Sequence, residues 1–201
     1  MTTKKDTGEF CTELIQQGII KVATKPKVAI PVEMAELKKK IEEIITLTDS
    51  TITKFDWLWE YDIVCSWLLD NKGRGLILLG DNGRGKSLFA TKVIPVLLKM
   101  HTGNTVRPIS SYQMQEEYDK IIRAPFVIID DVGEEPTIND FGNKYEIFSR
   151  VVDYCEKNSM LLIITTNLTS KQIMARYGVR TIDRLDKLCK VVIFTGQSYR
   201  K

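Results

Sequence analysis

The stretch LILLGDNGRGKSLFA, residues 76–90, decides the fold. It starts with an apolar run typical of a buried strand, passes through a glycine-rich turn and continues with residues typical of a helix. The turn has the spacing G-x-x-x-x-G-K-S and comprises Gly80, Asp81, Asn82, Gly83, Arg84, Gly85, Lys86 and Ser87, with Leu88 as the next residue. Glycines at this spacing let the backbone turn so that successive amide N–H groups face one point.

Such a point suits a phosphate chain, because the amides and the N-terminus of the following helix both favour negative charge. Lys86 would reach the β- and γ-phosphates, and the Ser87 hydroxyl would be a ligand to Mg²⁺. The sequence therefore predicts ATP and Mg²⁺ as cofactors at residues 80–88. The alternative is a glycine-rich turn that matches by accident, which average residue usage predicts in about one chain in a hundred of this length.

The composition limits the number of domains and the kind of partner. The chain has 201 residues, of which 43% are hydrophobic, enough for one core and a small accessory segment. The net charge of +3 is uneven, since residues 171–201 hold eight basic and two acidic side chains. This basic end would suit nucleic acid, phosphates or an acidic neighbour, and equally a solvated helix.

Cysteine usage and hydropathy indicate the compartment. Cys11, Cys65, Cys155 and Cys189 are far apart, and His101 is the only histidine in the sequence. This spacing favours buried thiols in a reducing cytosol over disulfides or a zinc site. The sequence has no signal peptide and no long apolar run, so we expect a cytoplasmic protein with no membrane partner.

The composition changes near residue 53 and predicts two regions. Residues 1–53 are expected to be a helical partner-binding segment, with helices in 8–20 and 34–47 joined by a proline-bearing linker at 25–33. The apolar stripe of the second helix, at Met34, Leu37, Ile41, Ile44 and Ile45, either packs on the main domain or forms a free docking surface. Residues 54–201 are expected to form the main domain.

Helical and strand-like segments alternate from Asp56 onward. A strongly apolar helix is expected from Asp56, its N-cap, to Asn71, with its three tryptophans in the core rather than stacked on bases. Short apolar strands follow at residues 76–80, 105–110, 125–130, 160–167 and 190–196. This alternation predicts an α/β fold with a parallel sheet and helices on both faces.

Polar residues at the ends of two strands are candidates for catalysis. Asp130 and Asp131 end one strand, at the edge where ligands bind in open α/β sheets. Asp130 would be a Mg²⁺ ligand and Asp131 would orient the attacking water, unless both only form a solvated turn. The next strand ends in Thr165, Thr166 and Asn167. A polar side chain there, such as Asn167, would hydrogen-bond the γ-phosphate or water, unless Asn167 only stops the strand. Farther on, Arg180 and Arg184 share a helical face, as a pair that addresses a neighbouring phosphate site would.

Five motifs together, GDNGRGKS, FVIIDDVG, IITTN, YGVRTIDRL and GQSYR, resemble the AAA+ ATPases of the DnaC helicase-loader and IstB transposition-helper group. The likeness covers residues 55–200. It implies the Walker A pair Lys86 and Ser87, the Walker B pair Asp130 and Asp131, Asn167 as sensor 1, Arg184 as an arginine finger assisted by Arg180, and Arg200 as sensor 2. It also implies a homo-oligomer joined through the finger, and a domain without a C-terminal lid.

The resemblance implies an ATP-dependent helicase loader for DNA replication, with a replicative helicase and single-stranded DNA as candidate partners. Many AAA+ proteins carry Asp-Glu where this chain has Asp130-Asp131, with Glu134 nearby, so we expect slow hydrolysis. Three alternatives remain open. These are an IstB-like helper that acts with a transposase, a nucleotide-gated adaptor with little turnover, and a small-molecule phosphotransferase, which the arginines of YGVRTIDRL argue against.

Overall fold

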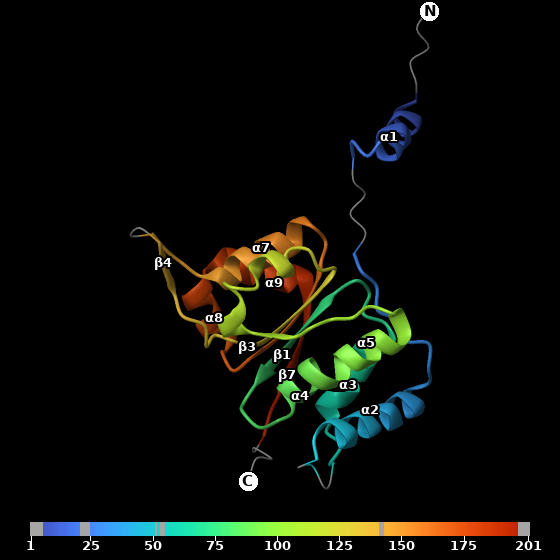
Figure 1. The fold of residues 1–201 in the computed structure, drawn as a ribbon, viewed down its shortest axis with the longest axis vertical. Coiled ribbons are helices and arrows are strands. Elements are labelled where there is room, and N and C mark those ends of the chain that lie inside the picture. The colour runs from blue at the N-terminus through green and yellow to red at the C-terminus, as the bar shows by residue number, and fades with distance from the viewer. Residues whose placement is uncertain (1–5, 21–24, 51, 53–54, 141–142, 197–201) are drawn as a thin grey trace, which may run out of the picture.

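A parallel sheet forms the centre of the molecule and confirms the predicted α/β fold (Figure 1). The computed structural model describes residues 6–20, 25–50, 52, 55–140 and 143–196. Within these residues the main sheet has five strands in the order β2-β3-β6-β1-β7. In chain order they are β1 (Gly75–Gly80), β2 (Ile109–Ser110), β3 (Phe126–Val132), β6 (Leu161–Thr166) and β7 (Cys189–Phe194). Each corresponds to one of the predicted apolar runs.

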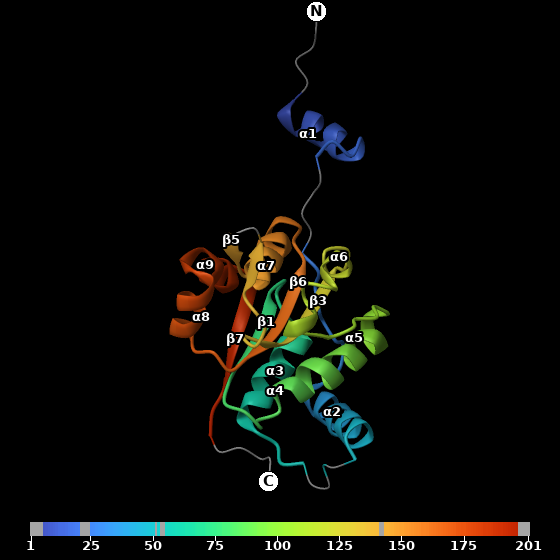
Figure 2. The same ribbon diagram turned by 60° about the vertical axis from the view of Figure 1, so that its left-hand side comes forward.

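Helices cover both faces of this sheet (Figure 2). One face carries α2 (Met34–Thr48), α3 (Trp59–Leu69) and the helical run α4 (Lys86–Leu88), η1 (Phe89–Val93) and α5 (Ile94–Thr102). The other carries η2 (Ser111–Gln113), α6 (Tyr118–Ile121), α7 (Ile147–Lys157), α8 (Ser170–Tyr177) and α9 (Val179–Leu188). The alternation of side chains along a strand divides the core accordingly, since Leu76 and Leu78 belong to the first cluster and Ile77 to the second.

The amphipathic helix α2 packs on the main domain and offers no free docking stripe. Its residues Leu37, Ile41 and Ile45 are completely buried, in one cluster with α3 and α5. Val28 and Ile30 of the preceding linker are buried in the same cluster. The predicted division at residues 53 and 54 therefore cuts through a continuous hydrophobic core.

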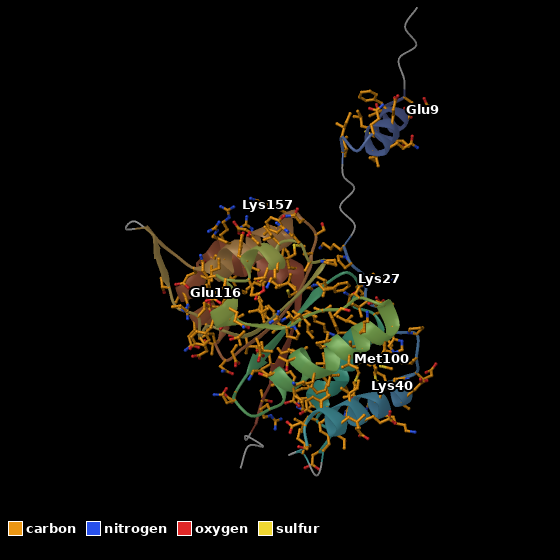
Figure 3. The ribbon with its side chains drawn as sticks, viewed as in Figure 1. Glu9, Lys27, Lys40, Met100, Glu116 and Lys157 are labelled. Carbon is orange, nitrogen blue, oxygen red and sulfur yellow. The ribbon has the colours of Figure 1, made fainter. Side chains whose placement is uncertain are left out.

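The first helix, α1 (Thr7–Gln16), differs from the rest of the N-terminal region. None of its residues is buried, and it lies apart from the sheet and its helices in both ribbon views. Figure 3 shows the Glu9 side chain on this detached helix. Phe10 and Ile15, and then Ile19 and Ile20, are exposed large apolar side chains. Among the described residues, the part that lies apart from the core is thus 6–20 rather than the whole N-terminal region.

Two truncations should separate these roles. Removing residues 1–24 should leave the free energy of unfolding unchanged, whereas removing residues 1–53 should lower it by about 5 kcal/mol or more, because each buried side chain of α2 contributes about 1.5–3 kcal/mol. Urea unfolding followed by tryptophan fluorescence measures both values. A chain starting at residue 54 with an unchanged urea midpoint would show that α2 adds nothing to the core.

Two local predictions need correction, and one pair of strands was not predicted. The helix predicted from Asp56 begins at Trp59 instead, with Leu58 as its N-cap. Trp67 is buried as expected, but Trp59 is 59% exposed and lies outside the core. The sequence also gave no sign of the hairpin of β4 (Ile138–Asp140) and β5 (Asn143–Tyr145), whose polar residues lack the apolar alternation of a strand.

The cysteines have the predicted chemistry in the main domain. Cys65, Cys155 and Cys189 are buried free thiols, and Cys11 on α1 is an exposed one. Burial raises the pKa of Cys65 and of Cys155 to about 12, so both thiols stay protonated. Among the described residues no cluster of histidine, cysteine and acidic side chains could hold a metal ion. No described helix has the length and apolar content needed to cross a membrane.

Candidate nucleotide site

The glycine-rich loop leaves β1 and enters α4 with a backbone that depends on glycine. Gly83 and Gly85 have φ values of +75° and +87°, in the left-handed region. A Cβ on Gly85 would lie 2.8 Å from the hydroxyl oxygen of Tyr61, so the loop also needs glycine there for space. The loop is therefore held in a curved shape by its own residues and by α3.

Lys86 lies at the start of α4, and its ammonium group folds back over the loop. Its Nζ donates hydrogen bonds to the carbonyl oxygens of Gly80, at 2.8 Å, and Asp81, at 2.7 Å. Ser87 is half-buried next to it, and Asp81 and Asn82 are exposed. Leu88 packs its side chain on the core. A cationic group over a curved glycine backbone, with a hydroxyl one residue on, fits the triphosphate and Mg²⁺ of ATP.

Arg84 faces away from the loop's centre. Its side chain is 7% exposed and donates to Glu60 Oε1 of α3 at 2.9 Å, and its carbonyl oxygen accepts from the Tyr61 hydroxyl at 3.2 Å. Only the backbone of Arg84 is therefore placed to line a phosphate cradle. Its side chain fixes the loop to the neighbouring helix.

Glu60 is a residue that the sequence analysis missed. Its carboxylate is completely buried, and Oε1 accepts both from Arg84 and from the backbone N–H of Thr195, at 3.1 Å. Burial alone would raise the pKa of this carboxyl, but the hydrogen bonds from Arg84 and Thr195 lower it below its usual value. Glu60 thus joins three segments, the loop, α3 and the residues after β7. The available signal was a carboxylate within the apolar run of residues 57–69, where Glu60 and Asp62 are the two acids.

The two acids of β3 reach the same edge of the sheet as the loop. Strand β6 lies between β1 and β3, all three are parallel, and their carboxyl ends point the same way. Asp130 and Asp131 are half-buried at the end of β3. Asn167 follows the end of β6 and is exposed. The structure therefore brings the loop, both acids and Asn167 to one edge, as an ATP and Mg²⁺ site requires.

The segment after the acids is tied to α8. Glu135 is 3% exposed, and its carboxylate accepts from the Gly133 N–H at 2.8 Å and from the Tyr177 hydroxyl. Burial, together with the hydrogen bond to Glu135, raises the pKa of Tyr177, which therefore stays a neutral donor. Arg176 donates to the carbonyl oxygens of Gly133 and Glu135. Glu134, by contrast, is exposed.

The two candidate arginines of α9 differ in how they are held. Arg184 is 12% exposed and binds two acids of α7, Asp153 and Glu156, with 2.6 Å from its Nε to Glu156 Oε2. The side chain of Arg180 is 74% exposed and lies 3.7 Å from Asp153 Oδ2. Arg184 thus joins α9 to α7 within the chain, whereas Arg180 reaches solvent. The sensor 2 candidate, Arg200, lies outside the described residues.

Comparisons with known proteins agree with this geometry. A family model described as RNA helicase matches residues 76–174, which hold the glycine-rich loop, the two acids and Asn167. A crystal structure of the DnaC helicase loader is 17% identical, with a TM-score of 0.58 over 71% of this chain and 94% of its own. A crystal structure of DnaI is 16% identical, with a TM-score of 0.51 over 86% and 88% of the two chains.

A third structure, AMPPCP-bound DnaA from Aquifex aeolicus, is 13% identical with a TM-score of 0.50, over 70% of this chain and 48% of its own. A search of curated protein sequences found no match. At these identities the solved structures establish the fold. The chain shares the α/β P-loop fold of the DnaC and DnaI structures, so the fold that its motifs predicted is confirmed.

Proposed function

We propose that this chain is an ATP-dependent loader of a replicative DNA helicase, which binds ATP with Mg²⁺ and hydrolyses it slowly in an assembly of several copies. The observation that carries the proposal is the meeting of the glycine-rich loop, Asp130 and Asn167 at one sheet edge, in a fold shared with the DnaC helicase loader. The bound Mg²⁺ would offset phosphate charge. Lys86 would bind the phosphates, Ser87 and Asp130 would hold the metal, and Asp131 would orient water.

Arg180 is the better candidate for a residue that enters the site of a neighbouring copy. It is the exposed member of the pair, while Arg184 is held by Asp153 and Glu156. We therefore assign Arg180 the role of the finger and Arg184 that of fixing α9 against α7. This reverses the order that the resemblance implied.

The proposed helicase contact is α1. Its Phe10 and Ile15 are exposed apolar side chains on a helix that is not part of the core, the kind of element that docks into a partner's groove. The full chain and a chain lacking residues 1–24 serve as matched baits in extracts of the native host. A replicative helicase captured only by the full chain supports the loader. A transposase would support the IstB-like alternative, and no specific protein from either bait would contradict both.

Lys86→Ala tests ATP binding directly. We expect ATP affinity in the presence of Mg²⁺ to fall at least about 100-fold, because each hydrogen bond to a charged group contributes about 1.5–3 kcal/mol. Isothermal titration calorimetry gives the affinity, and thermal unfolding checks the fold. Lys92→Ala removes the same charge from an exposed position in η1 and should bind ATP normally. Equal ATP affinity in the unsubstituted protein and both variants would contradict the assignment of the glycine-rich loop as the ATP-binding site.

A further inference from the structure

Thr165 lies at the end of β6, between the loop-bearing strand and the strand of the two acids. Its side chain is completely buried. From the sequence, the polar residues at this strand end were candidates to contact the γ-phosphate or water. The structure places the Thr165 hydroxyl against the two acids instead.

The register between β3 and β6 shifts at this point. Ile129 of β3 pairs with Ile164 of β6, but the next pair is Val132 with Thr166. Asp130 and Asp131 therefore lie opposite Thr165 alone, as in a β-bulge. Asp131 has a φ of +55°, in the left-handed region, which is uncommon for a residue with a side chain.

The Thr165 hydroxyl makes two hydrogen bonds across this bulge. It accepts from the backbone N–H of Asp131 at 2.8 Å and donates to Asp130 Oδ1 at 2.6 Å. The first bond gives an acceptor to the Asp131 N–H, which the bulge removes from the backbone hydrogen-bond ladder between β3 and β6. The second restricts the rotation of the Asp130 carboxylate. One buried hydroxyl thus sets the position of both acids.

We propose that Thr165 is the positioning residue for the Mg²⁺ ligand Asp130, a role that rests on the proposed ATP site. Groups that orient a metal ligand from behind typically change metal affinity by about 10- to 100-fold when removed. The affinity for the nucleotide without metal should be unaffected, because Thr165 makes its hydrogen bonds to Asp130 and Asp131 and not to the glycine-rich loop.

The test compares Thr165→Val with two matched variants. Thr165→Ser keeps the hydroxyl, and Thr166→Val makes the same change at the next buried residue, whose hydroxyl binds the Val132 carbonyl and the Leu168 N–H instead. A fluorescent, non-hydrolysable ATP analogue reports binding without Mg²⁺, and a Mg²⁺ titration of the complex reports metal affinity. Thr165→Val should weaken Mg²⁺ affinity about 10- to 100-fold with metal-free binding unchanged. Thr165→Ser and Thr166→Val should match the unsubstituted protein.

The outcomes separate this inference from the proposed function. If the unsubstituted protein does not bind the analogue at all, the ATP site itself is wrong and the inference falls with it. If it binds but Thr165→Val keeps normal Mg²⁺ affinity, the positioning role alone is overturned. If Thr165→Val does not fold, Thr165→Ala replaces it in the same Mg²⁺ titration. Loss of the fold in both would overturn the inference, because Thr165 would then be needed for the fold itself.

Discussion

Arg180→Ala should lower ATP turnover in the assembled protein by about 10³- to 10⁵-fold and leave ATP affinity unchanged. A finger arginine stabilises charge that develops on the γ-phosphate only in the transition state, and its loss has an effect of this size in other nucleotide hydrolases. The Arg180 side chain is exposed, as a residue that enters the site of another copy must be. Steady-state turnover at saturating ATP measures the effect, and Lys187→Ala, an exposed cation on the same helix, is the matched control.

Arg184→Ala distinguishes the two arginines. Because Arg184 binds Asp153 and Glu156, its removal should lower both the free energy of unfolding and turnover, whereas Arg180→Ala should lower turnover alone. A nearly normal rate in Arg180→Ala combined with a large loss in a stably folded Arg184→Ala would return the finger role to Arg184.

Among the single substitutions, Glu60→Ala has the largest expected effect on stability, a loss of about 3–5 kcal/mol in the free energy of unfolding. Removing one partner of a buried ion pair leaves the other charge uncompensated, and here it also removes the acceptor of the Thr195 N–H. Urea unfolding measures the loss. A variant with both Glu60 and Arg84 replaced by methionine should lose less than Glu60→Ala, because no single buried charge remains. An equal loss of free energy of unfolding in Glu60→Ala and in the double variant would contradict the role of Glu60 as the partner of Arg84.

The ion pair also predicts a pH dependence. The pKa of Glu60 is lowered in the folded chain, so the pair's stabilisation is complete above the ordinary glutamate pKa of about 4.3 and is lost as the pH falls through the lowered folded value. Glu60→Gln, which cannot titrate there, should lose less stability than the unsubstituted protein when the pH is lowered below about 4. An equal loss of stability in Glu60→Gln and in the unsubstituted protein would show that other groups dominate acid unfolding.

The sequence predicted those parts of the site that depend on local spacing. Lys86 and Ser87 follow from a pattern within eight residues, and Asp130 follows from its place at a strand end. The roles of Glu60 and Thr165 could not be found in this way, because each acts through a partner 24 or 35 residues away in the sequence. Thr165 was noticed as polar, but its role depends on a bulge that no local pattern shows.

The fold was predictable for a similar reason. Short apolar runs separated by helices specify a parallel sheet wherever both faces are covered. The role of α2 was left open because an amphipathic stripe at Leu37 and Ile41 is the same whether the helix packs on its own domain or on a partner. Only the burial of these residues with α3 and α5 decides between the two.

A mixing experiment tests the central claim, that this is an ATPase whose site is completed by another copy. Arg180→Ala keeps the P-loop and Lys86→Ala keeps the arginine, so neither should turn over ATP alone. In a randomly mixed one-to-one assembly about a quarter of the interfaces would pair a good loop with a good arginine. The account predicts turnover well above the sum of the two separate variants, and specific activity of the unsubstituted protein that rises with its concentration. Turnover no higher than that sum, with constant specific activity across a wide dilution series, would contradict it.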